Sequence, residues 1–260
     1  MGEERERRTG YRRHLANLNM FGTTQLHFRN PWVVAWWSAA FPGAGHILLQ
    51  KYFRGFFLFI WEMVVNSRSN LNLSMVYSFN GKFEMAKEVL DLRWMALYAP
   101  VYLFAIYDSY RTCVDLNKMT FLARHEKAPM RAFLIGPFEI NYLDKRKPWI
   151  ALVWSLLGPG MGQLYAHRIV NALFATVTWI MFVYYSNAYV ALYYTLTGQF
   201  EKAGDVVDWE WLMFIPSTYF FTAYDAYVNT VESNSLFDME MREYLRDAYG
   251  NASALPSLKP

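Results

Sequence analysis

Residues 31–49, PWVVAWWSAAFPGAGHILL, and residues 148–166, PWIALVWSLLGPGMGQLYA, are two versions of one apolar segment. Their starts are 117 residues apart, since 148 − 31 = 117, and this offset continues without a gap from the first segment to Asn117, which aligns with Asn234. Identical residues occupy 25 of the 87 aligned positions, and they include tryptophans, glycines and aspartates. Chance does not keep such residues in register over this length, so the sequence predicts two tandem repeats.

Each quoted segment has about the length of a membrane-crossing helix, which needs about 20 apolar residues, but each contains a break. Proline removes a backbone donor and glycine has low helix propensity, so a Pro-Gly-x-Gly motif kinks or unwinds a helix. Small residues also allow close helix packing, and a neighbour must satisfy the freed backbone groups. We therefore expect a helix break, and contact between the two repeats, at Pro42, Gly43, Gly45, Pro159, Gly160 and Gly162.

The composition favours a polytopic helical membrane protein of the all-α class. Hydrophobic residues make up 54% of the chain and charged residues 18%, against about 45–50% and about 25% in soluble domains. Aromatic residues reach 19%, and their rings favour the edges of a bilayer. A disulfide scaffold is excluded because Cys113 is the only cysteine. Each repeat has two to three apolar helices, predicted at 32–49, 53–65 and 94–107, and at 149–166, 169–196 and 211–224.

Charge sets the expected orientation, with the N-terminus inside. Arginines crowd residues 1–30, and further basic residues lie in or beside residues 118–147, so both segments are expected in the cytoplasm. Each repeat then crosses the membrane an even number of times, with a re-entrant hairpin at the motif and a parallel duplication. The alternative is three crossings per repeat and an inverted second copy. The absence of an early apolar run before Trp32 argues against a cleavable signal peptide, and a bacterial cytoplasmic membrane is expected.

These patterns divide the chain into five segments. They are a basic cytoplasmic N-terminal segment at 1–30, a first membrane repeat at 31–117, a basic cytoplasmic linker at 118–147, a second membrane repeat at 148–234 and a polar C-terminal tail at 235–260.

The order of apolar helix, Pro-Gly-x-Gly turn, short basic hinge and second apolar helix resembles the TM-two domain family of small membrane proteins. The resemblance covers Trp32–Val65 and Trp149–Phe182. The hinge residues are Lys51, Arg54, His167 and Arg168. The resemblance implies membrane embedding, here as a diverged tandem pair, and implies little chemistry.

Asp108 and Asp225 recur in register within a Tyr-Asp-x-Tyr motif that also contains Tyr107 and Tyr224. One interpretation is that each aspartate marks the cytoplasmic end of a helix and shares a hydrogen bond with a tyrosine of the neighbouring helix. The other is that both face a cavity and bind a cation or relay a proton, because a carboxylate at membrane depth is costly to bury.

Glu62 is a third candidate for a polar membrane site. It aligns with a tryptophan of the second repeat, so it is not duplicated. We expect it to reach the interface or to pair with Arg54 or Arg68, and a transport role is the alternative.

No catalytic constellation emerges from the sequence. The five histidines share no metal-ligand spacing, and no Gly-x-Ser-x-Gly motif is present. We therefore expect no catalytic, cofactor or metal site. A net charge of +3 is too small to indicate nucleic-acid binding. The expected function is that of a non-enzymatic scaffold or accessory subunit that meets the lipid bilayer and other membrane proteins or a second copy of itself. The alternative is a small-solute or ion transporter or channel that uses the paired helix breaks and the membrane-depth carboxylates.

Overall fold

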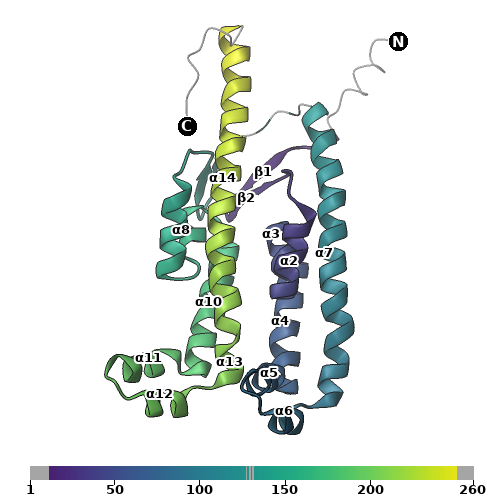
Figure 1. Ribbon diagram of the computed structural model, residues 1–260. Coiled ribbons are helices and arrows are strands. Elements are labelled where there is room, and N and C mark those ends of the chain that lie inside the picture. Colours follow the sequence, from purple (N-terminus) through teal and green to yellow (C-terminus); the bar gives the residue numbers. More distant parts are fainter. Residues whose placement is uncertain (1–11, 127, 129, 131, 251–260) are drawn as a thin grey trace.

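The computed structural model describes residues 12–250 except 127, 129 and 131, and it is mostly helical (Figure 1). The predicted helical class is confirmed. The arginines among the first eleven residues, together with Lys127 and Arg131, lie outside the described residues, so they add nothing to the structural account of the basic segments.

Both halves of the chain contain the same order of helices. The first half contains α2 (Pro31–Ala40), α3 (Ala44–Leu48), α4 (Tyr52–Ser69), α5 (Leu71–Phe79), α6 (Phe83–Val89) and α7 (Leu92–Glu126). The second half contains α8 (Pro148–Leu157), α9 (Met161–Tyr165), α10 (Ile169–Ser186), α11 (Ala188–Leu196), α12 (Phe200–Val206), α13 (Trp209–Leu212) and α14 (Phe214–Tyr249). The bounds of the first five helices of each half differ by 117, the offset found in the sequence. In both halves the fourth and fifth helices lie at the far end of a bundle formed by α4, α7, α10 and α14 (Figure 1).

The helix breaks predicted at both Pro-Gly-x-Gly motifs are present. Gly43 has φ 96° and Gly160 has φ 102°, which is backbone that favours glycine. After each break the chain turns back. In the second half, the Lys147 amide just before α8 donates to the Tyr165 hydroxyl at the end of α9, 3.3 Å away. Each motif therefore lies at the tip of a short helical hairpin, and the long helix α4 or α10 follows it.

The motif glycines pack within their own half, whereas Phe41 and Ala44 of the first break belong to a core cluster shared with the second half. A Cβ on Gly43 would lie 2.9 Å from the amide nitrogen of Phe59, and a Cβ on Gly160 would lie 2.7 Å from the carbonyl oxygen of Ala172. Both neighbours belong to the same half as the glycine. The lack of a side chain lets the break approach the next long helix of its own half.

Aromatic side chains hold the two halves together. Phe56 of α4 stacks on Phe174 of α10 with ring centroids 4.0 Å apart. Trp37 of α2 meets Phe221 of α14 at 5.4 Å in an edge-on arrangement, which suits the charge distribution of aromatic rings. Phe41, beside the first break, reaches Phe214 at 5.9 Å. The contact between halves therefore comes from rings near the breaks.

The apolar stretch at 169–196 was expected to form one spanning segment, and this is wrong. The α10 helix ends at Ser186, and Asn187 adopts the left-handed conformation with φ 53°. Its side-chain amide donates to the Val206 carbonyl, 3.1 Å away. In the first half, Asn70 adopts the same conformation with φ 53°, and its side-chain amide donates to the Val89 carbonyl, 3.2 Å away. Asparagine tolerates this backbone conformation, so it ends each long helix and starts a turn.

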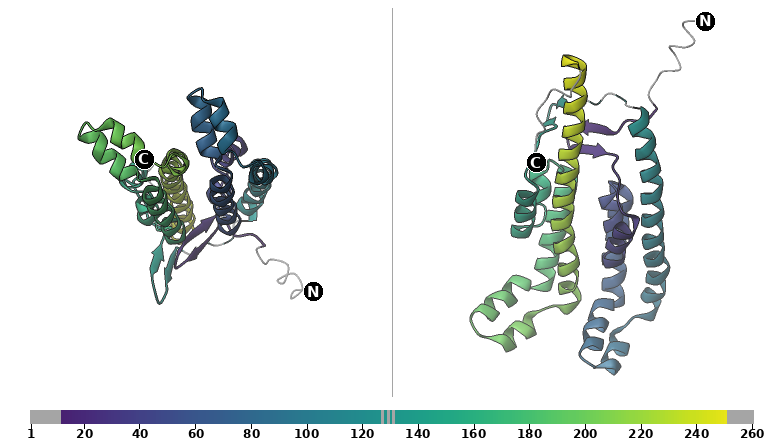
Figure 2. Two further views of the ribbon diagram at one scale, coloured as in Figure 1. Left: turned by 90° about the horizontal axis from the view of Figure 1, so that it is seen from below. Right: turned by 45° about the horizontal axis from the view of Figure 1, so that its top comes forward.

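Two small hairpins lie in the basic segments, one in the N-terminal segment and one in the linker. Strand β1 (Ala16–Asn19) pairs antiparallel with β2 (Gly22–Gln25), and β3 (Phe133–Ile135) pairs antiparallel with β4 (Ile140–Tyr142). Seen from below, both hairpins project sideways from the bundle (Figure 2). The expected segment boundaries after 117 and 234 both fall inside helices, since α7 continues to Glu126 and α14 to Tyr249.

One helix, α10, is long and apolar enough to cross a bilayer among the described residues. Helix α7 meets the same criterion only together with α6, which is bent by 90° from it. The 10 residues of α8 form a shorter apolar helix.

Candidate functional site

The bundle exposes many apolar side chains, and it buries clusters of polar side chains beside an apolar core. Along α10, exposed apolar residues follow one face at helical spacing, at Val170, Leu173, Val177, Ile180 and Tyr184. The buried side chains include many polar ones, among them Glu62, Asn66, Asn72, Ser109, Gln163, Arg168, Asn171, Glu210 and Asp225. These buried polar clusters are the place to look for a functional site.

Asp225, on α14, is the centre of the most complete polar cluster, which we call the Asp225 site. Its Oδ2 accepts hydrogen bonds from Asn171 at 2.7 Å and Gln163 at 3.2 Å. Its Oδ1 accepts from Arg168 at 3.2 Å and Asn229 at 2.6 Å. The aspartate is 0% exposed. A buried charge is tolerated only when it is paired and hydrogen-bonded, and this carboxylate has both kinds of partner.

The Asp225 site also connects distant parts of the chain. Arg168 donates to the hydroxyl of Tyr52, which lies on α4 in the other half. Asn229 accepts from Arg29 of the N-terminal segment at 3.2 Å, and Arg29 also binds Glu232 at 2.8 Å. The site therefore fixes the N-terminal segment, the first half and the second half to each other.

His27 lies beside this network, outside the long helices. Burial lowers the pKa of His27, although its Nε2 lies 2.9 Å from Glu232, whose negative charge acts to raise it. Desolvation disfavours the charged imidazolium. The positive charge that balances Glu232 at neutral pH is therefore supplied by Arg29 rather than by His27.

The matching Asp108 site is smaller and more open. Asp108 Oδ2 lies 2.9 Å from His46 Nε2 and accepts from Arg54 Nη1 at 2.6 Å. The Asp108 side chain is 19% exposed and that of Arg54 is 52% exposed. His46 occupies the position of Gln163, and Arg54 that of Asn171, at the offset of 117. The two halves thus place different partners around one shared aspartate.

The structure corrects the expected role of the tyrosines. Neither aspartate bonds to a tyrosine, and both instead bind the short helix that follows the break. Tyr107 is 61% exposed. Tyr224 packs against Trp37, with ring centroids 5.2 Å apart. Asp225 is also not the solvated charge at a helix end that the first interpretation expects, because it is 0% exposed and α14 continues to Tyr249.

A third polar cluster, the interface network, joins the halves at the far end of the bundle. Glu62 Oε1 accepts from Asn66 at 2.9 Å and from the Tyr98 hydroxyl at 3.2 Å. Asn66 donates to Asn72 at 3.2 Å, and Asn72 donates to the backbone carbonyl of Glu210 at 2.9 Å. The expected pairing of Glu62 with an arginine is therefore wrong.

Each of the two glutamates of the interface network keeps one buried oxygen without a partner. These atoms are Glu62 Oε2 and Glu210 Oε1. Glu210 binds the Leu73 amide through its other oxygen at 2.7 Å. Leaving a buried acceptor unpaired costs free energy. Both carboxylates are therefore incompletely satisfied.

Several of these groups are absent from the residues singled out by the sequence. Glu210 ends the acidic stretch 201–210, in which no single residue stands out as a site. His46 and Gln163 drew attention only as a mismatch between the repeats. Their shared position could have identified them. Each is a polar residue in an otherwise apolar run, three positions after the glycine of a proline-glycine pair.

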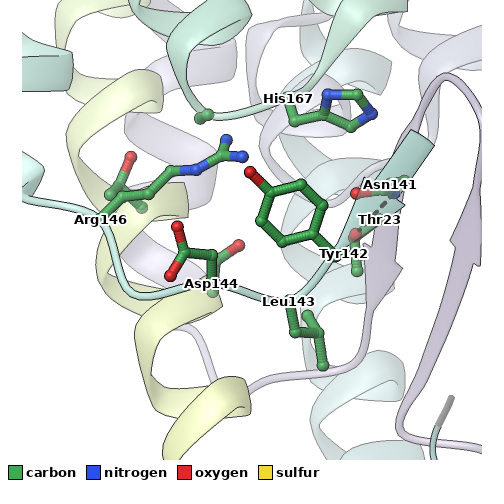
Figure 3. Close-up of a pocket in the computed structure, with 10 residues that line it drawn as sticks. Thr23, Asn141, Tyr142, Leu143, Asp144, Arg146 and His167 are labelled. Atoms are coloured by element: carbon green, nitrogen blue, oxygen red, sulfur yellow. Dashed lines mark hydrogen bonds between the residues drawn. The ribbon is translucent and has the colours of Figure 1, made fainter. Parts of the chain in front are cut away.

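The small pocket in Figure 3 lies where the hairpins meet the end of α9. Asn141 donates to Thr23 at 3.2 Å and to the Asn19 carbonyl at 2.8 Å, which ties the two hairpins together. The pocket volume is about 20 Å³, which is the scale of one water molecule. Within the described part of the chain, no three His, Cys, Asp or Glu side chains gather as metal ligands.

No family model, curated protein or solved structure matches this chain. The polar sites are therefore interpreted from their own geometry.

Proposed function

We propose that the chain is an integral membrane protein that acts as a non-enzymatic scaffold or accessory subunit of a membrane complex. The observation that supports this most strongly is the exposed apolar surface of the long helices. The outward side chains of α4 include Phe53, Phe57, Ile60 and Val64, and those of α7 include Leu103 and Phe104. Such continuous exposed apolar surface is typical of contact with lipid or with another membrane protein.

In this proposal α4, α7, α10 and α14 cross the bilayer, and the α2–α3 and α8–α9 hairpins enter and leave it on the same side. The two copies are then parallel. Helix α7 has 35 residues, or about 52 Å at 1.5 Å per residue, so its second half extends into the cytoplasm. The family resemblance and the matching helix bounds of the two halves support a duplicated membrane unit.

The geometry favours a structural role over transport at the aspartates. All four hydrogen-bond donors around Asp225 come from the protein itself. The cavity between the halves in mid-bundle is about 10 Å³ and is lined by apolar residues such as Ile47, Phe59 and Phe221. A solvated ion does not fit there.

The topology makes a direct labelling prediction. In a Cys113→Ser background, a cysteine at Asp144 is expected to react with a membrane-impermeant maleimide only from the cytoplasmic side, because the basic linker stays inside. A cysteine at Gly81 is expected to react only from the other side. Cys113 itself is buried, so the substitution removes little reactivity. Labelling of both sites from one side contradicts the crossing pattern.

A scaffold is expected to hold a partner at fixed stoichiometry. A photo-crosslinking amino acid at Tyr107, on the exposed face of α7, is expected to capture one membrane protein or a second copy of the chain. The same residue at Ile180 on α10 serves as the control for general lipid exposure. Two results together contradict the proposal of a scaffold. They are crosslinks to lipid alone from both positions and transport of solute by the monomer in liposomes.

Transport is the second candidate, and the interface network favours it. Two buried carboxylates from different halves each present a free oxygen, and neither is bonded to a cationic side chain. An ionisable group at membrane depth is a candidate for ion or proton passage. If this candidate holds, Glu62→Gln is expected to abolish flux in liposomes without loss of folded protein.

The same substitution has an expected effect on stability. Glu62→Gln removes a buried charge that lacks a full set of partners, and an unsatisfied buried group costs about 1–3 kcal/mol. We expect a higher thermal midpoint in detergent at pH 8. Glu84→Gln, on the exposed surface of α6, is the control and is expected to change stability by less than about 0.5 kcal/mol. A lower midpoint for Glu62→Gln at pH 8 contradicts the argument.

A further inference from the structure

The linker hairpin, formed by β3 and β4, has one covered face and one exposed face. Side chains alternate between the two faces of a strand. On the covered face, Asn141 is buried and binds Asn19 and Thr23 of the N-terminal hairpin, formed by β1 and β2. The exposed face, which we call the apolar face, consists of Phe133, Ile135, Ile140 and Tyr142. An antiparallel sheet that faces water on one side usually places polar side chains there, so this face is unsuited to water.

Phenylalanines occupy the tips of both hairpins. Phe138 at the tip of the linker hairpin is 82% exposed, and Phe21 at the tip of the N-terminal hairpin is 51% exposed. The two tips lie against each other, because a Cβ on Gly136 would collide with the side chain of Met20. The exposed apolar surface of the linker hairpin therefore continues onto the tip of the N-terminal hairpin.

The hairpin tips lie beside the start of α10. The amide of Ile169, the first residue of α10, donates to the Phe21 carbonyl, 3.0 Å away. Phe21, Ile135 and Val170 line one open hollow of about 770 Å³, and Val170 is the first residue of the exposed apolar stripe on α10 described above. Both hairpins project sideways from the bundle here (Figure 2). Since α10 meets the criterion for crossing a bilayer, the tips lie at one boundary of its apolar span.

The segments that contain the hairpins also hold the excess positive charge of the chain. Residues 1–30 and 118–147 contain 13 basic and 6 acidic residues, whereas the rest of the chain contains 12 basic and 16 acidic residues. The cytoplasmic surface of a bilayer is negative, and it attracts basic segments that also present apolar side chains. A second copy of this chain would bring the same basic segments together, and like charges oppose that association. The charges therefore favour an anionic lipid surface as the partner of the apolar face.

We propose that the two hairpins bind the headgroup layer of an anionic bilayer, with Phe138, Phe21 and the apolar face inserted among the lipids of the cytoplasmic leaflet. The inference rests on the proposed membrane embedding. It places part of the basic linker in the membrane surface rather than in solution. Aromatic rings are favoured at this boundary of a bilayer, and the basic residues of the same segments attract its anionic headgroups.

Spin-label accessibility in liposomes tests the proposal. In a Cys113→Ser background, a nitroxide is attached to Phe138→Cys, and its collisions with oxygen, which concentrates in lipid, are compared with those with a nickel chelate, which stays in water. Oxygen collisions are expected to dominate in vesicles of phosphatidylglycerol and phosphatidylcholine. The matched control is Asp144→Cys, which lies just after β4 and is exposed, and nickel collisions are expected to dominate there. If Phe138→Cys fails to fold, Phe21→Cys is expected to give the same excess of oxygen collisions.

Three results would overturn the proposal. The first is an excess of nickel collisions at Phe138→Cys. The second is spin–spin broadening between copies at this position, because a second copy then covers the hairpins. The third is an unchanged excess of oxygen collisions in vesicles of phosphatidylcholine alone, since the excess is expected to fall without anionic headgroups.

The cysteine-labelling experiment separates this inference from the membrane embedding. If cysteines at Asp144 and Gly81 show the crossing pattern while the hairpin tips stay in water, only the inference about the hairpins fails. A failed labelling pattern overturns the membrane embedding on which the inference rests.

Discussion

Asp225→Asn is expected to destabilise the protein by about 3–5 kcal/mol, because it leaves the buried charge of Arg168 without its counter-charge. The asparagine keeps the shape of the side chain, so the loss reports charge pairing rather than packing. Unfolding of detergent-solubilised protein by sodium dodecyl sulfate, followed by tryptophan fluorescence, measures the change.

Asp108→Asn is the matched control at the same position of the first half. Its ion-pair partner Arg54 is 52% exposed, and exposed ion pairs contribute about 0–1 kcal/mol. The expected loss is therefore at most about 1 kcal/mol. The double variant Arg168→Gln with Asp225→Asn removes both charges and is expected to recover part of the stability. Equal losses at the two aspartates contradict the assignment of one buried and one open site.

Gly160→Ala is expected to cost about 2–5 kcal/mol. The left-handed backbone contributes about 1–2 kcal/mol of this for a residue with a side chain. The remainder comes from overpacking, about 1–3 kcal/mol, since the new Cβ lies against Thr176 and 2.7 Å from the Ala172 carbonyl oxygen. The same unfolding measurement applies, and the folded yield in detergent is expected to fall with it.

Two glycines separate these contributions. Gly198 has φ 76° and no atom within 4 Å of its missing Cβ, so Gly198→Ala is expected to cost only the backbone part, about 1–2 kcal/mol. Gly204 lies in α12 with open space around it, and Gly204→Ala is expected to stabilise by about 0.5–1 kcal/mol. A Gly160 variant no worse than the Gly198 variant contradicts the close approach of the break to α10.

Local sequence patterns predicted the parts of the fold that depend on neighbouring residues. A proline followed by two nearby glycines favours a helix break, so the ends of α2 and α8 could be read from the sequence. A proline alone is not sufficient, since Pro100 lies inside α7. The left-handed turn at Asn187 was missed because asparagine is only one of several polar residues that can end a helix. The hairpins were missed because their strands are three or four residues long and lie in segments of mixed polarity.

The partners of the acidic residues could not be predicted in the same way. Asp225 binds Gln163, 62 residues earlier in the chain, and Glu210 binds Leu73, 137 residues earlier. Such pairs arise only when the helices pack, and no local pattern encodes them. The offset of 117 did identify the aspartates as equivalent. It gave no indication that one is open and the other buried, because that difference comes from Arg54 in one half and Asn171 in the other.

The bond between Arg29 and Glu232 has a consequence for biosynthesis. The two residues are separated by 203 positions, so the first of them leaves the ribosome long before the second. At about 5–20 residues per second, the N-terminal segment waits roughly 10–40 s for its partner on α14. During that interval the Arg29 side chain lacks the contacts with Asn229 and Glu232 that hold it in the finished protein. In a nascent chain that has not yet reached α14, this guanidinium lacks both partners.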